Sequence, residues 1–212
     1  MIDRIREDVR TARETDPAAK STAEVFLYAG LYAVWLHGVA HRLDERGHRL
    51  LARLLAQVNR LLTGVEIDPG AELGRRVFID HGMGVVIGET AEIGDDVNMY
   101  HGVTLGGNDP RPVKRHPTVE DGATLGAGST LVGDITIGEG ATVGAGAVVV
   151  GDVPPGATVA GNPAERVDTA EETEEPASPG PEVVADGEQE AEAETGSPAV
   201  EYPRPCCGMG RS

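Results

Sequence analysis

Cysteine is nearly absent from this chain. The 212 residues include only two cysteines, Cys206 and Cys207, which are adjacent. Such a pair cannot cross-link a domain, because neighbouring residues form a disulfide only with strain. Exposed thiols of this kind are typical of a reducing compartment. The shortage therefore excludes a disulfide-stapled fold and favours a cytoplasmic protein.

Long apolar runs and an excess of basic residues are also missing. Residues 1–13 alternate charges without an apolar centre, so we expect no secretory signal peptide. The apolar stretch 25–40 is too short to span a bilayer. The formal net charge is −17, which disfavours nucleic acid and anionic membranes as partners. So acidic a composition suits high salt, and we expect a halophilic protein.

Acidic residues are most concentrated near the C-terminus. Residues 167–212 hold twelve acidic against two basic residues, together with six prolines. Such a segment cannot bury enough apolar surface to offset its ordering entropy. We therefore expect a disordered acidic tail over 167–212, after an α-helical domain over 1–64 and a second domain over 65–166.

A six-residue repeat dominates the second domain. Period six fits neither the 3.6-residue repeat of a helix nor good helix propensity. Three hexads make one triangular coil that buries its apolar residues against neighbouring coils. The repeat therefore predicts a parallel β-helix of roughly five coils, and an α+β protein overall. The leading aliphatic positions are Ile67, Leu73, Ile79, Val85, Ile87, Ile93, Met99, Leu105, Val119, Leu125, Leu131, Ile137, Val143 and Val149.

The repeat is interrupted twice. A two-residue slip separates Val85 from Ile87. The stretch 106–118 contains three prolines and cannot continue a buried strand ladder, which predicts an excursion loop. Loops on a rigid scaffold often carry function. Basic side chains gather in this one: Arg111, Lys114, Arg115 and His116.

The first third of the chain has helical patterns. An amphipathic segment is interrupted at Asp16, which precedes a proline. A capping box at Ser21 and Glu24 predicts a helix that runs to about Arg46. A further helix is predicted over 48–62, before a glycine. The histidines of this region are expected to be structural: His37, His41 and His48.

Two short motifs are candidates for chemistry. Asp80 and His81 depart from the hexad pattern, and a histidine beside a carboxylate is the minimal general base for an alcohol. Glu66 lies fourteen residues earlier, so it is predicted near the same edge of the prism. Arg115, beside His116, suits bidentate recognition of a carboxylate. An ordinary polar turn and a solvated loop remain the alternatives for these two motifs.

Several stretches together resemble serine O-acetyltransferase, a left-handed β-helix enzyme of the hexapeptide-repeat acyltransferases. The resemblance extends from about Asp8 to Val167. Its most specific parts are the Asp-His-Gly-x-Gly run and the loop from Thr-Leu-Gly-Gly to Arg-His-Pro. The stretches that carry it are Thr63–Ala71, Ile79–Thr90, Gly102–Gly107, Arg115–Pro117 and Ala160–Ala164.

The resemblance implies an activity and the roles of four acidic or histidine side chains. Acetyl-CoA, as a co-substrate, gives its acetyl group to L-serine, forming O-acetyl-L-serine for cysteine biosynthesis. No metal and no tightly bound cofactor are implied. His81 would be the general base, with Glu66 as its carboxylate partner. Asp16 and Asp80 would hold the serine ammonium group.

The resemblance also assigns the rest of the site. Arg115 would hold the serine carboxylate, and His116 would lie against the hydroxyl. The pantetheine arm of CoA would follow a groove between prisms, where small residues let backbone amides approach. These residues are Gly106, Gly107, Gly126, Ala127, Gly128, Gly144, Ala145 and Gly146.

A triangular prism favours closed threefold symmetry, and we expect a homotrimer or a dimer of trimers. A complex with O-acetylserine sulfhydrylase is not expected, because the relatives that form it end in isoleucine and this sequence ends in serine. Other functions remain open: another hexapeptide O-acetyltransferase acting on homoserine, a sugar or an antibiotic, a γ-type carbonic anhydrase, and a non-catalytic assembly module. The anhydrase would need zinc held by His81, His101 and His116.

Overall fold

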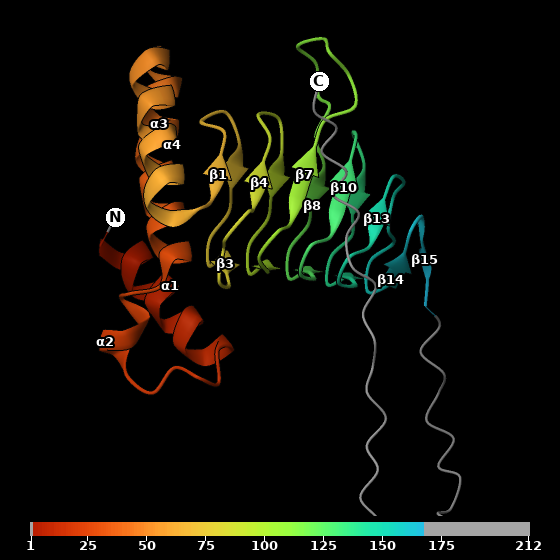
Figure 1. Ribbon diagram of the computed structural model, residues 1–212, viewed down its shortest axis with the longest axis horizontal. Helices are drawn as coiled ribbons and strands as arrows, with labels where there is room; N and C mark the ends of the chain where they lie inside the picture. The colour runs from red at the N-terminus through yellow and green to blue at the C-terminus, as the bar shows by residue number, and fades with distance from the viewer. Residues whose placement is uncertain (1, 168–212) are drawn as a thin grey trace, which may run out of the picture. The chain divides into compact units, whose positions relative to one another are not determined.

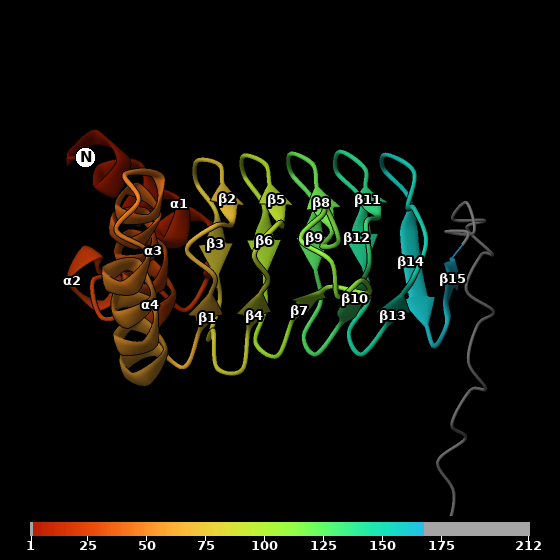
Figure 2. The same ribbon diagram turned by 90° about the horizontal axis from the view of Figure 1, so that it is seen from above.

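Four helices precede a stack of short strands in the computed structural model, which describes residues 2–167 (Figures 1 and 2). The predicted tail from residue 168 on, with its two cysteines, lies outside the described residues. No helix within 2–167 is both long and apolar enough to cross a membrane. The helices are α1 (Ile2–Thr15), α2 (Thr22–Val25), α3 (Ala29–Glu45) and α4 (Arg49–Thr63).

The strands form three sheets, and each of the first four coils contributes one strand to each sheet. The last coil adds β13 and β14 but meets the second sheet only through an isolated bridge between Ile137 and Val153. The sheet orders are β1-β4-β7-β10-β13, β2-β5-β8-β11 and β3-β6-β9-β12-β14-β15. All pairs are parallel except β14 with β15, so the predicted parallel β-helix is confirmed. The strands are β1 (Glu66–Ile67), β2 (Glu72–Leu73), β3 (Phe78–Ile79), β4 (Val86–Ile87), β5 (Glu92–Ile93), β6 (Asn98–Met99), β7 (Thr104–Gly106), β8 (Thr118–Val119), β9 (Thr124–Leu125), β10 (Thr130–Val132), β11 (Thr136–Ile137), β12 (Thr142–Val143), β13 (Val148–Val149), β14 (Thr158–Gly161) and β15 (Ala164–Arg166).

Apolar ladders run through the inside of the coils. Leu105 and Leu131 are paired in register and fully buried. Each aliphatic residue that leads a hexad thus packs on its equivalents one coil away, which is how a repeat protein buries a core that no single repeat could close. The ladder of the first sheet consists of Ile67, Ile87, Leu105, Leu131 and Val149.

Both predicted interruptions occur at corners of the prism. Partners in neighbouring coils are eighteen residues apart where the repeat is regular, as for Val86 and Thr104. Glu66 and Val86 are twenty apart, and the two extra residues lie between β3 and β4. Thr104 and Thr130 are twenty-six apart, because the loop between β7 and β8 adds eight. This loop projects above β7 in Figure 1.

The prediction of one continuous helix from Ser21 to Arg46 is wrong, because the structure has two helices there. The capping box is present, since the Ser21 hydroxyl accepts from the Glu24 amide and the Glu24 carboxylate accepts from the Ser21 amide. However, α2 ends at Val25, and Tyr28 has an extended backbone with φ −71° and ψ 121°. The break lets the Tyr28 hydroxyl reach the Asp16 carboxylate.

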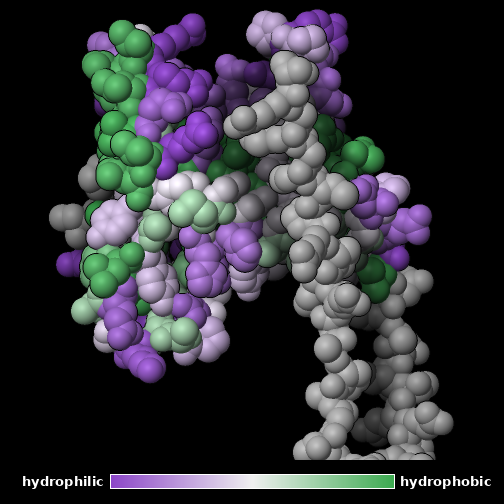
Figure 3. All heavy atoms as spheres, viewed as in Figure 1, coloured by the Kyte–Doolittle hydropathy of each residue, from purple (hydrophilic) through white to green (hydrophobic). Residues whose placement is uncertain are grey.

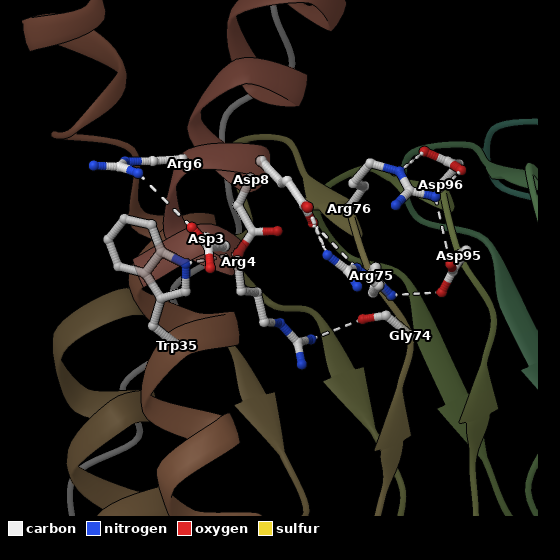
Figure 4. Close-up of polar contacts among 11 residues, drawn as sticks. Asp3, Arg4, Arg6, Asp8, Trp35, Gly74, Arg75, Arg76, Asp95 and Asp96 are labelled. Carbon is white, nitrogen blue, oxygen red and sulfur yellow. Dashed lines mark hydrogen bonds and ion pairs between the residues drawn. The ribbon is translucent and has the colours of Figure 1, made fainter. Parts of the chain in front are cut away.

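Helix α1 is fastened to the turns of the first coils by charged side chains (Figure 4). Arg4 donates to the carbonyl of Gly74 at 2.7 Å, and Arg75 donates to Glu7 at 3.1 Å. These bonds tie the N-terminal helix to the β-helix across roughly seventy residues of sequence. Two further contacts complete the cluster: Arg76 with Asp96 at 2.6 Å, and the Trp35 indole with Asp8 at 2.8 Å.

Helix α3 covers the open end of the first coil. His37 Nε2 lies 3.1 Å from the carbonyl oxygen of Ala71, and His41 Nδ1 lies 2.8 Å from that of Pro69. The helix approaches so closely at Gly30 that a Cβ there would lie 2.0 Å from the carbonyl oxygen of Ile79. His37 and His41 thus contact the backbone of the coil, as expected of structural residues.

Candidate functional site

The extra residues of the first coil build a turn that presents His81. This residue has φ 59°, in the left-handed region that residues with a side chain seldom adopt. The His81 side chain is 76% exposed and that of Asp80 is 25% exposed. Their Nε2 and Oδ2 atoms lie 3.8 Å apart, so a carboxylate stands beside the imidazole.

Asp16 and Tyr28 of the helical region belong to the same corner. The Tyr28 hydroxyl donates to Asp16, as does the Ala18 amide at 2.8 Å. These bonds, the Tyr28 bond foremost, lower the pKa of Asp16, and the nearby charge of His81 lowers it further. The bond to Asp16 is the largest influence that raises the pKa of Tyr28 to about 12, and Asp80 adds to the rise. Asp16 therefore lies within electrostatic range of His81.

His101 joins this group from the next coil. Its ring lies edge-on to that of His81, with centroids 6.1 Å apart. The sequence made a weak case for His101, because no acidic residue lies close to it in the chain. His101 follows His81 by twenty residues, which is the length of the first coil. This spacing was the signal in the sequence that the two histidines would stack in neighbouring coils. The group formed by Asp16, Tyr28, Asp80, His81 and His101 is called the His81 corner below.

The predicted pantetheine residues continue the edge that starts at this corner. Successive turns are stacked by backbone hydrogen bonds, from the Gly128 amide to the His101 carbonyl and from the Gly146 amide to the Ala127 carbonyl, both at 2.8 Å. Histidine in the earlier coil gives way to Ala127 and Ala145 in the later ones. The edge therefore passes from imidazole rings to a stretch with small side chains.

A second group forms where the excursion loop returns to the coils. The Thr90 hydroxyl accepts from the amides of Arg115 and His116 at 3.0 and 3.1 Å. Lys114 donates to the Thr90 carbonyl at 2.8 Å, and Arg115 Nη2 donates to Glu89 at 2.8 Å. These five residues are called the His116 corner. Glu89 and Thr90 have no role predicted from the sequence, although both lie in a stretch that carries the resemblance.

Arg115 gives the His116 corner an unused hydrogen-bond donor. Arg115 Nη1 is buried and has no partner among residues 2–167. A buried, unpaired guanidinium nitrogen is costly unless a ligand completes it, and a carboxylate has the matching geometry. His116 is buried beside Arg115, and burial first and the Arg115 charge second lower its pKa.

Glu66 forms an ion pair with helix α4. Its Oε2 atom lies 3.2 Å from Nη1 of Arg60 on α4. No contact within the described part of the chain joins Glu66 to His81, and the carboxylate beside His81 is that of Asp80. Of the predicted CoA residues, Gly107 lies at the other corner, because a Cβ there would lie 3.0 Å from His116 Nε2.

The two corners lie at opposite sides of one prism face. The segment 85–88, which includes β4, crosses this face, and at about 3.3 Å per residue it separates the corners by roughly 10 Å. His81 and His101 share one corner while His116 lies at the other. Residues 2–167 contain no group of three His, Cys, Asp or Glu side chains placed to hold a metal ion.

Comparisons with known proteins agree on one family. Residues 116–151 match the family "Bacterial transferase hexapeptide (six repeats)". Serine acetyltransferase of Mycobacterium tuberculosis is 54% identical over 78% of this chain and 72% of its own length. Soybean serine acetyltransferase complexed with serine superposes with a TM-score of 0.75, at 46% identity over 78% of this chain and 68% of that one. The Brucella abortus enzyme in complex with coenzyme A gives a TM-score of 0.76, at 36% identity over 78% and 67%. The matches and the parallel sheets fit the expected left-handed β-helix.

Proposed function

Because the chain belongs to the serine acetyltransferase family, we infer that it transfers the acetyl group of acetyl-CoA to the hydroxyl of L-serine. The product, O-acetyl-L-serine, would enter cysteine biosynthesis. The observation that carries this conclusion is the 54% identity to the Mycobacterium tuberculosis enzyme over most of both chains. The chemistry of the two corners agrees with it, since one offers a base among carboxylates and the other a cation with a free donor.

We propose that His81 removes the proton of the serine hydroxyl. The alkoxide attacks the thioester carbonyl, the tetrahedral intermediate expels CoA thiolate, and the thiolate takes the proton back from His81. Binding both substrates in one orientation replaces a bimolecular encounter, so no acyl-enzyme is required. Asp80 is the carboxylate beside His81 in the structure, and Glu66 remains proposed as its partner once substrates are bound.

The ends of serine are assigned to opposite corners. Asp16 and Asp80 hold the ammonium group, supported by the lowered pKa of Asp16, which keeps that carboxylate ionised. Arg115 takes the carboxylate, supported by its buried and unpaired Nη1. His116 lies against the hydroxyl. This division favours an amino-acid acceptor over a sugar, which has no carboxylate for Arg115.

Acetyl-CoA is proposed to bind as a co-substrate along the edge below His81. Small residues there leave backbone groups open to the amide-rich pantetheine arm: Gly126, Ala127, Gly128, Gly144, Ala145 and Gly146. Gly106 and Gly107 would contact it from the excursion loop of the adjacent protomer. Acetyl-CoA bound in this way would place its thioester group next to the His81 imidazole.

The separation of the two corners supports a homotrimer. In a threefold assembly of prisms, the His81 corner of one protomer can face the His116 corner of the next, which completes the site. A broad apolar face on α4 supports pairing of two such trimers through their helical ends, and Figure 3 shows its hydrophobic band on the side away from the coils. Its exposed members are Leu50, Leu51, Leu54, Val58, Leu61 and Leu62. A cytoplasmic location and adaptation to high salt remain proposals from composition.

A rate assay separates this function from its alternatives. CoA release from acetyl-CoA is followed at high salt with L-serine, L-homoserine and a galactoside in parallel. We expect L-serine to give the highest kcat/KM. A higher value with homoserine or the galactoside would assign the chain to another hexapeptide O-acetyltransferase, and no CoA release with any acceptor would contradict the proposal.

A further inference from the structure

The hydrogen bonds of Thr90 admit only one arrangement. A hydroxyl has one hydrogen to donate and two lone pairs that accept. Both lone pairs of Thr90 are taken by backbone amides, those of Arg115 at 3.0 Å and His116 at 3.1 Å. The third partner, Nδ1 of His116, lies 2.9 Å from the hydroxyl oxygen. The single hydroxyl hydrogen must therefore point at Nδ1.

The imidazole of His116 is thereby fixed in one state. The backbone amide of Thr90 also donates to Nδ1, at 3.2 Å. Two donors aimed at the same ring nitrogen leave no place for a hydrogen on it. His116 is then neutral and carries its hydrogen on Nε2.

The imidazole of His116 packs against two glycines, at positions where any side chain would collide with the ring. A Cβ at Gly88 would lie 2.1 Å from Nε2 of His116, and a Cβ at Gly107 would lie 3.0 Å from it. Nε2 has no hydrogen-bond partner within the described residues. It is the one free donor that this ring offers, and it lies beside the unpaired Arg115.

We propose that Thr90 is a positioning residue that holds His116 as a neutral Nε2–H donor toward the serine hydroxyl oxygen. This inference rests on the proposed function. The hydroxyl oxygen accepts from His116, so its own proton is left for His81. When that proton moves to His81, the same bond becomes charge-assisted and stabilises the alkoxide. His116 itself gains and loses no proton in the cycle.

The charges around His116 act on its pKa in both directions. Arg115 and Lys114 disfavour an imidazolium there, whereas Glu89 and Asp68 favour it. Burial is the largest influence, and the pKa of His116 lies below its usual value. Protonation at Nδ1 would also set an N–H against both Thr90 donors.

The state of the ring is measured directly by NMR. Protein labelled with ¹⁵N-histidine is examined at pH 7 without substrates, and the His116 signals are assigned by their loss in His116→Gln. We expect a protonated Nε2 and an unprotonated Nδ1. A hydrogen on Nδ1, in either a neutral or a charged ring, would overturn the inference. The result does not depend on turnover, so failure of the serine acetylation assay would count only against the proposed function.

The contribution of the hydroxyl is measured with two substitutions at Thr90. Thr90→Val removes the donor at constant shape, and we expect the His116 pKa to rise by about one unit. The acid limb of kcat/KM for serine should move up with it. Thr90→Ser keeps the hydroxyl and should restore both values. Thr124→Val, on β9 away from both corners, is the matched control and should change neither. An unchanged His116 titration in Thr90→Val, or failure of Thr90→Ser to restore it, would contradict the role of Thr90.

Discussion

His81 has a backbone conformation that elsewhere in the coils belongs mostly to glycine. The other left-handed residues along this edge are glycines, such as Gly84, Gly102, Gly128 and Gly146. A residue with a side chain is held there at a cost of order 1 kcal/mol or more, and such residues are concentrated at functional sites. The gain is an imidazole presented at the prism edge beside Asp80.

Loss of the His81 imidazole should remove the general base but leave the fold intact. We expect His81→Ala to lower kcat by about 10²–10⁴-fold, the usual contribution of general-base catalysis. The oligomeric state, measured by light scattering, should stay as in the parent. His48→Ala, at the exposed N-terminus of α4, serves as the control. Near-normal turnover in His81→Ala would remove this residue from the mechanism.

His37 should make the protein less stable in acid. Burial lowers its pKa to about 4 in the folded protein, whereas an unfolded histidine titrates near 6.5. The unfolded chain therefore binds the proton first as pH falls. Stability is complete above about pH 6.5 and is lost toward pH 4, by up to roughly 3 kcal/mol. Urea unfolding at several pH values should show a smaller acid loss in His37→Gln than in His48→Gln. Equal losses in the two variants would contradict this assignment.

At the scale of elements, stability depends on the ladders inside the coils. Leu131 is fully buried between Leu105 and Val149. We expect Leu131→Ala to lower the free energy of unfolding by about 2–5 kcal/mol, because it leaves a cavity that neighbouring coils cannot close. Val150 is exposed, and Val150→Ala should change stability little. Chemical denaturation of the two variants compares them, and similar midpoints would refute the ladder argument.

The hexads predicted the elements well because each coil repeats the same side-chain period. Both interruptions were also visible, since a slip or a proline breaks that period locally. The break between α2 and α3 was not visible, because apolar residues continue through 25–28. The break places the Tyr28 hydroxyl against Asp16, twelve residues away, and no local pattern reports such a contact.

For the candidate site, too, the sequence predicted some residues and missed others. Local motifs and the resemblance predicted His81 and Arg115 as site residues. They gave no role to Thr90, whose contact with His116 joins residues twenty-six apart in neighbouring coils. Only the fold brings such a pair together, because the length of the excursion loop determines which residue returns to the turn after β4.

At the scale of the whole molecule, the distance between the corners makes a quantitative prediction. His81→Ala and Arg115→Ala are each expected to be nearly inactive alone. If protomers share sites, every mixed trimer contains one junction with both corners intact. Random assembly at equal amounts should then give about a quarter of the parental activity. Co-expression with two affinity tags measures this recovery. No recovery would mean that each chain completes its own site.

The two ends of the coil stack are closed by different elements. Helix α3 lies against the first coil at Gly30, and β15 folds back antiparallel on β14 at the other end. A bare end would present unpaired amides and carbonyls in the arrangement that cross-β fibres extend without limit. The coils are therefore a finite length of a pattern that can otherwise polymerise. A chain that lost α3 or β15 would be at risk of growing end to end into filaments, so both closures protect solubility as well as shape.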